Sequence, residues 1–270
     1  MDNTDRHGVV SSPPSFMGLF YCHERRSLGG FKDVRHDPTE RCRAAIGADQ
    51  SCFDNVVIEF EYNLATMTRV KVCGITTPDD ACLAAEYGAD AVGLIFAESS
   101  RKVSVEEARE IAAALPDDVL KVGVFVDAEP AKVLRIAAEV GLDYAQLHGD
   151  ESPEVVAAVR GGGLKVMKAF RVRGTASLEA LRYYEADLYL LDAYSERVRG
   201  GTGERFDWVL AKSLTGRGNI VISGGLTPEN VREAIRFFEP YGVDASSSLE
   251  DAPGKKNAER VRRFVSAAKG

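Results

Sequence analysis

The sequence predicts a single closed barrel of eight parallel strands, each followed by a helix. Short apolar runs rich in β-branched residues recur at intervals of roughly 20 to 30 residues, and helical patterns with clear starts lie between most of them. Alternation of strand and helix implies parallel pairing through right-handed crossovers, and burial on both faces explains the nearly continuous apolar runs. Eight such units in about 200 residues give a (β/α)8, or TIM, barrel; an open sheet would usually have fewer strands.

The expected strands are Val70–Ile75, Ala91–Phe96, Lys121–Val126, Tyr144–His148, Leu164–Phe170, Leu188–Asp192, Asn219–Ser223 and Gly242–Ser246. Most are followed by a helix start that carries a polar N-cap residue, a proline or acidic residues. These starts are Thr76–Asp80, Ser104–Glu107, Glu129–Pro130, Ser152–Glu154 and Thr227–Asn230. Gly88 and Gly141 precede the next strand, as glycines at helix C-termini do.

Residues 1–66 differ from the rest of the chain. They hold three of the four histidines and three of the five cysteines, and only Asn55–Tyr62 could form a strand or one helical turn. The spacing of these side chains does not fit a metal site. We therefore interpret 1–66 as a poorly structured N-terminal extension, or as sequence upstream of a true start at Met67, and we place the barrel domain at 67–270.

The composition, with 45% hydrophobic and 28% charged residues, is that of an ordinary globular protein. A net charge of −7 argues against nucleic-acid partners. We find no apolar run long enough to cross a membrane and no secretory signal. The five irregularly spaced cysteines lack a C-x-x-C pair and fit a reducing compartment, which we expect to be the cytoplasm. We expect no metal ion or cofactor, and a monomer or homodimer.

Polar residues gather where the expected strands end, and in this fold those ends share the face that holds the chemistry. Cys73 precedes Gly74 at the end of the first strand, where a cysteine is most often a small buried apolar side chain. It would act as a base if nearby positive charge or a helix N-terminus lowered its pKa. Asp192 ends the apolar run YLLD, and desolvation there would raise its pKa and suit it to donate a proton.

Two proton-transfer groups on opposite sides of one ring suggest an isomerisation. Lys71 and Lys168 could instead form a Schiff base. We expect Lys71 to alternate to the other side of its strand from Cys73, which leaves Lys168 as the better candidate.

A phosphate site is expected after the last two strands. Gly224 and Gly225 offer exposed backbone amides before a helix start, and Ser246–Ser248 can open a short helix aimed at the same point. Such amides bind anions, and the loops after strands seven and eight are the usual phosphate position in this fold. We therefore expect a small phosphorylated substrate.

Several longer motifs share a family likeness. They are KVCGIT (71–76), SSRKVS (99–104), QLHGDE (146–151), GGTGERFDW (200–208), SGGLTPENV (223–231) and VDASSSLEDAPGKKN (243–257). From Met67 to the C-terminus, in order, the chain resembles the phosphoribosylanthranilate isomerase family of tryptophan biosynthesis. This family carries out an Amadori rearrangement of an aminoaldose to an aminoketose.

The resemblance implies a role for each matching residue. Cys73 would be the general base that takes the proton from C2 of the sugar, and Asp192 the general acid that opens the furanose ring. Arg101 would hold the anthranilate carboxylate, which a fork-shaped cation suits. Asp244 would contact the substrate near its phosphate, and His148 would either steady the site or satisfy a buried polar strand end.

The resemblance also implies that Gly225, Ser246 and Ser247 bind the phosphate and that the loop Gly200–Gly203 closes over the pocket. Two positions depart from the family pattern. Ser248 stands where the family usually has glycine, which would forbid a positive φ angle or crowd the phosphate. Ala245 replaces the usual valine, a change in packing.

Other readings remain open at this point. The histidine-pathway isomerase performs the same rearrangement but normally uses two aspartates, and indole-glycerol phosphate synthase relies on catalytic lysines, for which Lys168 is the one good candidate. A barrel kept only to bind phosphate or a partner is the non-catalytic reading, and the presence of both proton-transfer residues argues against it.

Overall fold

The computed structural model describes residues 68–172, 175–192 and 218–270. The chain divides into two units, Met1–Cys52 and Phe53–Gly270, and the described residues all belong to the second unit. The expected extension over 1–66 and the loop Gly200–Gly203 lie outside the described residues. No helix in the described part of the chain combines the length and apolar content needed to cross a membrane.

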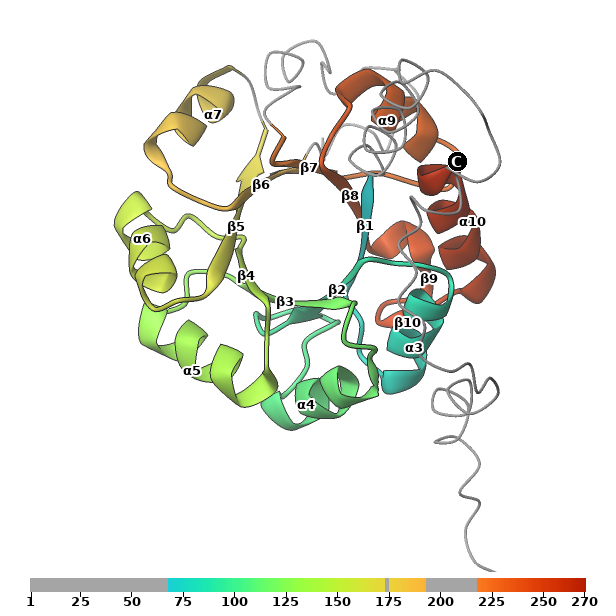
Figure 1. Ribbon diagram of the computed structural model, residues 1–270, viewed down its shortest axis with the longest axis horizontal. Helices are drawn as coiled ribbons and strands as arrows, with labels where there is room; N and C mark the ends of the chain where they lie inside the picture. Colours follow the sequence, from blue (N-terminus) through green and yellow to red (C-terminus); the bar gives the residue numbers. More distant parts are fainter. Residues whose placement is uncertain (1–67, 173–174, 193–217) are drawn as a thin grey trace, which may run out of the picture. The chain divides into compact units, whose positions relative to one another are not determined.

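Eight parallel strands close into a barrel in sequence order, with β1 paired to both β2 and β8. The strands are β1 (Arg69–Cys73), β2 (Ala91–Ile95), β3 (Leu120–Phe125), β4 (Tyr144–Leu147), β5 (Lys165–Arg171), β6 (Leu188–Asp192), β7 (Ile220–Ser223) and β8 (Gly242–Ala245). Figure 1 shows the strands as a ring with the helices around its outside. The predicted fold class is confirmed, and each predicted strand lies within two residues of its observed bounds.

The helices are α3 (Pro78–Glu86), α4 (Val105–Ala114), α5 (Pro130–Val140), α6 (Pro153–Gly161), α7 (Thr175–Glu179), α9 (Val231–Phe238) and α10 (Ala258–Lys269). The 3-10 turns are η2 (Ala180–Tyr183) and η4 (Ser247–Leu249), and β9 (Glu250–Ala252) pairs with β10 (Lys255–Lys256) after η4.

The caps explain most of these helix ends. The Thr77 hydroxyl accepts a hydrogen bond from the Asp80 amide, and Ser104 forms a reciprocal capping box with Glu107. Gly141 ends α5 in the left-handed conformation that glycine favours. The predicted start at Thr227 is three residues early, because the residues before Asn230 form a turn and Asn230 occupies the N-cap position of α9 without a capping side-chain hydrogen bond.

Alternation along the strands separates two apolar layers. One set of strand side chains, including Val70, Val72 and Leu94, packs against the surrounding helices. The opposite set fills the barrel and comprises Ala91, Val122, Tyr144, Met167, Ala169, Leu188, Leu190 and Val221. Other interior-facing residues, such as Cys73, Asp192 and Asp244, are polar and lie nearer the carboxyl ends of the strands. The interior therefore changes from apolar to polar along the barrel axis.

Candidate active site

The polar half of the barrel interior brings together side chains from strands far apart in the sequence. Cys73 is the last residue of β1 and Asp192 is the last residue of β6. Asp244 lies on β8, Ser223 ends β7, and His148 follows β4 directly. The strand parity directs all five toward the same mouth of the barrel.

Two glycines make room for Cys73. A Cβ atom on Gly93, which pairs with Cys73 across β1 and β2, would lie 2.6 Å from the Cys73 sulfur and 3.1 Å from its Cα. Gly74 has φ +75°, and a Cβ there would lie 2.6 Å from Arg101 Cδ and 2.9 Å from Ser246 Oγ. The absence of a side chain at Gly74 lets Arg101 and Ser246 approach the backbone beside the thiol.

Lys71 lies in the same interior as Cys73, which corrects the expectation that it alternates to the other side. Residues two apart on a strand share a face, so the sequence itself required this arrangement. Lys71 Nζ donates a hydrogen bond of 2.9 Å to Asp244 Oδ1, and both side chains are buried. Ser223 Oγ donates to the other carboxylate oxygen of Asp244 at 3.2 Å.

Burial raises the pKa of the Cys73 thiol above its ordinary value, and the Asp244 carboxylate adds to the rise. The ammonium groups of Lys71 and Lys256 act in the opposite direction, since each favours the thiolate. The positive charge that the sequence argument required is thus present beside the thiol, but in the free protein burial outweighs it.

His148 directly follows β4, and its side chain faces Asp192 at the end of β6. Its Nε2 atom lies 3.5 Å from Asp192 Oδ2, and its Nδ1 atom is 2.7 Å from Gln146 Nε2. Gln146 is almost fully buried, and its Oε1 atom has no hydrogen-bond partner among the described residues. Gln146 therefore orients the imidazole ring, and the ring in turn faces the carboxylate.

Arg101 is held by an acidic partner that the sequence reading missed. Its Nε and Nη2 atoms donate to the Glu250 carboxylate at 2.6 to 3.0 Å, a bidentate arrangement. Lys256 Nζ donates to the same carboxylate at 2.7 Å and to the Cys73 carbonyl oxygen at 2.6 Å. This chain of charges holds the Arg101 side chain against Gly74, directly after β1.

The glycine and serine residues of the expected anion site lie at the ends of the neighbouring strands β7 and β8. Gly224 and Gly225 have φ angles of 87° and 65°, and Ser247 begins η4. Ser246 Oγ is buried and has no hydrogen-bond partner among the described residues. Ser248 does not need a positive φ angle, and its hydroxyl donates to the Leu226 carbonyl oxygen at 2.5 Å, so this departure from the family pattern is accommodated.

Lys168 does not face this mouth. It is 2% exposed, and its ammonium donates to Glu151 Oε2 at 2.8 Å and to the carbonyl oxygens of Leu147, Gly149 and Ala169. Lys168 lies on the helix-facing side of β5, and its hydrogen bonds hold the loop that follows β4. The expectation that Lys168 could form a Schiff base is therefore wrong.

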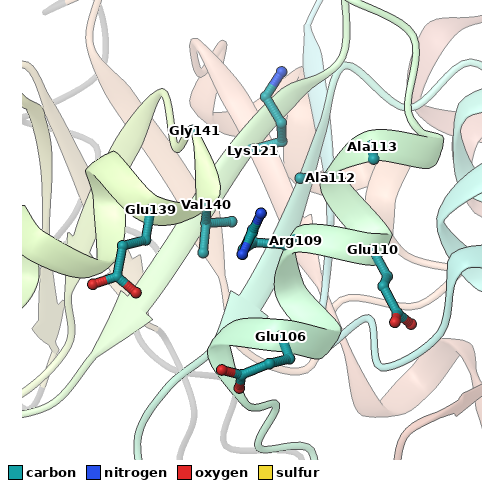
Figure 2. Close-up of a pocket in the computed structure, with 9 residues that line it drawn as sticks. All are labelled: Glu106, Arg109, Glu110, Ala112, Ala113, Lys121, Glu139, Val140 and Gly141. Atoms are coloured by element: carbon teal, nitrogen blue, oxygen red, sulfur yellow. The ribbon is translucent and has the colours of Figure 1, made fainter.

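Two hollows lie away from the strand ends. A groove of about 670 Å³ runs between α4 and α5 on the outside of the barrel, and Figure 2 shows Arg109 between the two helices with Glu106 and Glu139 at its sides. A smaller hollow of about 250 Å³ includes Arg69 and Tyr241 and lies at the amino-terminal end of the strands. Neither contains Cys73 or Asp192.

A closed parallel barrel that brings a thiol, a carboxylate and a glycine-rich turn to its carboxyl-terminal mouth is typical of the (β/α)8-barrel class of enzymes. The family model of N-(5'-phosphoribosyl)anthranilate isomerase matches residues 70–267. The chain belongs to the phosphoribosylanthranilate isomerase family.

Individual similar proteins support the same family assignment. The N-(5'-phosphoribosyl)anthranilate isomerase of Rubrobacter xylanophilus is 66% identical over 205 residues, which cover 75% of this chain and 100% of that protein. The crystal structure of the Thermotoga maritima phosphoribosyl anthranilate isomerase has a TM-score of 0.70 and 44% identity, and it covers 76% of this chain and 100% of its own. A phosphoribosyl anthranilate isomerase in complex with reduced 1-(o-carboxyphenylamino)-1-deoxyribulose 5-phosphate has a TM-score of 0.67 and 42% identity, with the same coverage.

Proposed function

We propose that the chain carries out the reaction of its family with Cys73 as the general base and Asp192 as the general acid. The reaction is the Amadori rearrangement of N-(5-phosphoribosyl)anthranilate to 1-(2-carboxyphenylamino)-1-deoxyribulose 5-phosphate, a step of tryptophan biosynthesis. One observation carries this assignment. Cys73 and Asp192 are the last residues of their strands, and both face the barrel interior at the same mouth.

In the proposed mechanism, one acid and one base transfer the protons. Asp192 protonates the ring oxygen, the bond from that oxygen to C1 breaks, and the nitrogen lone pair forms the C1–N double bond of a Schiff base. Cys73 then takes the C2 proton, and the electron pair of the C2–H bond forms the C1–C2 double bond and neutralises the nitrogen. Return of a proton to C1 and loss of the C2 hydroxyl proton give the ketone, so no oxidant or reductant is consumed.

Arg101 is the proposed site for the anthranilate carboxylate. Its pKa is raised by the hydrogen bonds to Glu250, so it stays a cation, and its Nη1 group has no hydrogen-bond partner among the described residues. A guanidinium held from one side by Glu250 can still present this remaining group to a second carboxylate.

The phosphate is proposed to bind Gly224, Gly225, Ser246 and Ser247. Support comes from the left-handed Gly–Gly turn beside the buried Ser246 hydroxyl, which lacks a partner within the described residues. Asp244 lies on β8 two residues before Ser246 and is proposed to contact the substrate near the phosphate, with Lys71 as its present partner.

His148 is proposed to steady the Asp192 carboxylate at the opposite side of the mouth. The support is its Nε2 atom, 3.5 Å from Asp192 Oδ2, and the Gln146 amide that orients its ring.

Two substitutions test the acid and base. Cys73→Ala and Asp192→Asn should each lower kcat by about 100-fold or more, the usual contribution of a positioned acid or base, while KM changes little. The assay follows the loss of fluorescence of the anthranilate adduct. Cys82→Ala is the matched control, because Cys82 lies half-buried in α3 with its sulfur near the Ala114 carbonyl oxygen. Wild-type turnover in either test variant would remove that residue from its role.

The chain is further proposed to be a cytoplasmic monomer or homodimer. One relative, the Thermotoga maritima enzyme, is described as dimeric, at a TM-score of 0.67 and 42% identity. Sedimentation of the full chain at several concentrations distinguishes the two states.

A further inference from the structure

Lys71 is a buried cation that the proposed acid–base chemistry does not use. It is 4% exposed, lies in the polar half of the barrel interior and comes two residues before Cys73. Burying an ammonium group is unfavourable unless it is paired, so the presence of Lys71 inside the barrel requires a reason.

Lys71 is shared between two groups. Its Nζ atom is 2.9 Å from Asp244 Oδ1, and its positive charge also lowers the pKa of the Cys73 thiol. A Cβ on Gly93 would lie 2.6 Å from the sulfur and 3.1 Å from Lys71 Nζ, which places the two atoms on the same side of β2. Burial disfavours the ammonium form, but the facing Asp244 and Cys73 outweigh it, so the pKa of Lys71 is raised and the group stays charged at neutral pH.

We propose that Lys71 is a positioning residue for the reaction, whose ammonium group, anchored by Asp244, stabilises the anionic form of the Cys73 sulfur. The inference rests on the proposed role of Cys73 as the base. A thiol must lose its proton before it can take one from C2, and a nearby cation favours that anionic form inside a protein.

The charged groups around the sulfur come from three strands and one loop. Lys71 on β1 and Lys256 on β10 favour the anion, whereas Asp244 on β8 opposes it, and Arg101 after β2 is a more distant cation. Lys256 contacts the Cys73 carbonyl oxygen and Glu250, so much of its charge is already paired. Lys71 lowers the pKa of the Cys73 thiol more than Lys256 does. If Asp244 contacts the substrate as proposed, the Lys71 ammonium can interact more strongly with the Cys73 sulfur.

The test is the pH dependence of Cys73 alkylation by iodoacetamide in the full chain. A Cys82→Ala background removes the other cysteine of the same tryptic peptide, and mass spectrometry quantifies the modified Cys73 peptide. In Lys71→Met the alkylation midpoint should move up by about 1 to 3 pH units, as expected for loss of an adjacent opposite charge. At a fixed pH below both midpoints the alkylation rate should therefore fall by about 10-fold or more.

Lys168→Met is the matched control, because it also removes a buried lysine from an ion pair but on the helix-facing side of β5. Both variants should unfold at lower temperature, and only Lys71→Met should shift the midpoint. Lys71→Gln removes the charge while keeping a hydrogen-bond donor for Asp244, and it gives the same comparison if the methionine variant does not fold. An unchanged midpoint in the Lys71 variant, or an equal shift in the Lys168 control, overturns the inference.

The same measurements separate this inference from the assignment of the base. A shifted midpoint in Lys71→Met together with full turnover in Cys73→Ala supports the Lys71 inference and rejects Cys73 as the base. An unshifted midpoint together with loss of turnover in Cys73→Ala keeps the base and rejects the role of Lys71.

Discussion

Gly93 offers a sharp test of how the barrel positions the reactive sulfur. It pairs with Cys73 across the first two strands, and the strand parity directs both toward the barrel interior. In Gly93→Ala the added methyl group would lie 2.6 Å from the sulfur, 3.1 Å from the Cys73 Cα and 3.1 Å from Lys71 Nζ. Rotation of the cysteine side chain can relieve the first contact, but the contact with Cα requires β1 to move relative to β2.

The expected size of the effect follows from these contacts. Overpacking a buried site costs about 1 to 3 kcal/mol, which lowers Tm by about 2 to 4 °C per kcal/mol in a domain of this size. A displacement of the sulfur by about 1 Å should lower kcat by about 100-fold, because proton transfer depends steeply on geometry. The activity loss should therefore be much larger than the loss of stability alone would cause at 25 °C.

Thermal unfolding and the adduct-fluorescence assay measure the two effects separately. Gly161→Ala is the control, since the last residue of α6 has no heavy atom within 4 Å of an added Cβ and does not need a positive φ angle. It should keep wild-type turnover and be unchanged or slightly more stable. Wild-type Tm and kcat in Gly93→Ala would refute the inference that the close contact between Gly93 and Cys73 positions the sulfur.

Three further substitutions and one truncation have definite expected outcomes. Lys168→Met leaves its partner carboxylate buried and unpaired, so urea denaturation should show a loss of about 3 to 5 kcal/mol; an unchanged midpoint would contradict this. Ser248→Gly should cost about 1 kcal/mol of unfolding free energy through one lost hydrogen bond and leave KM unaltered, whereas a lower KM would mean that the hydroxyl crowds the phosphate. Burial acts to raise the pKa of Glu250, but hydrogen bonds from two cations hold it below its ordinary value. The stability it contributes is therefore full above the unfolded value of about 4.3 and lost as pH falls through the folded pKa, so Glu250→Gln should flatten the acid limb of the unfolding curve, and equal limbs would speak against the ion pair. A chain that begins at Met67 should turn over substrate at the rate of the full chain, and a slower rate would give residues 1–66 a function.

The sequence alone determined the barrel and much of its mouth. Strands buried on both faces leave continuous apolar runs, and each run ends at a residue such as Cys73 or Asp192 that the parallel topology must place at one end of the barrel. The position of Lys71 on the same face as Cys73 was also present in the sequence, in their separation by two residues. The prediction that Lys71 lies on the other side of its strand was wrong, because the structure places Lys71 inside the barrel with Asp244.

The tertiary structure decided the partners of these side chains. Arg101 and Glu250 are 149 residues apart, Lys71 and Asp244 are 173 apart, and Lys256 and Cys73 are 183 apart. No local pattern encodes such pairs, because they depend on the closure of β8 against β1 and on the register in which those two strands meet. Local sequence fixes which way a side chain points along its own strand, whereas the charge that it meets there is supplied by a strand from the other end of the chain.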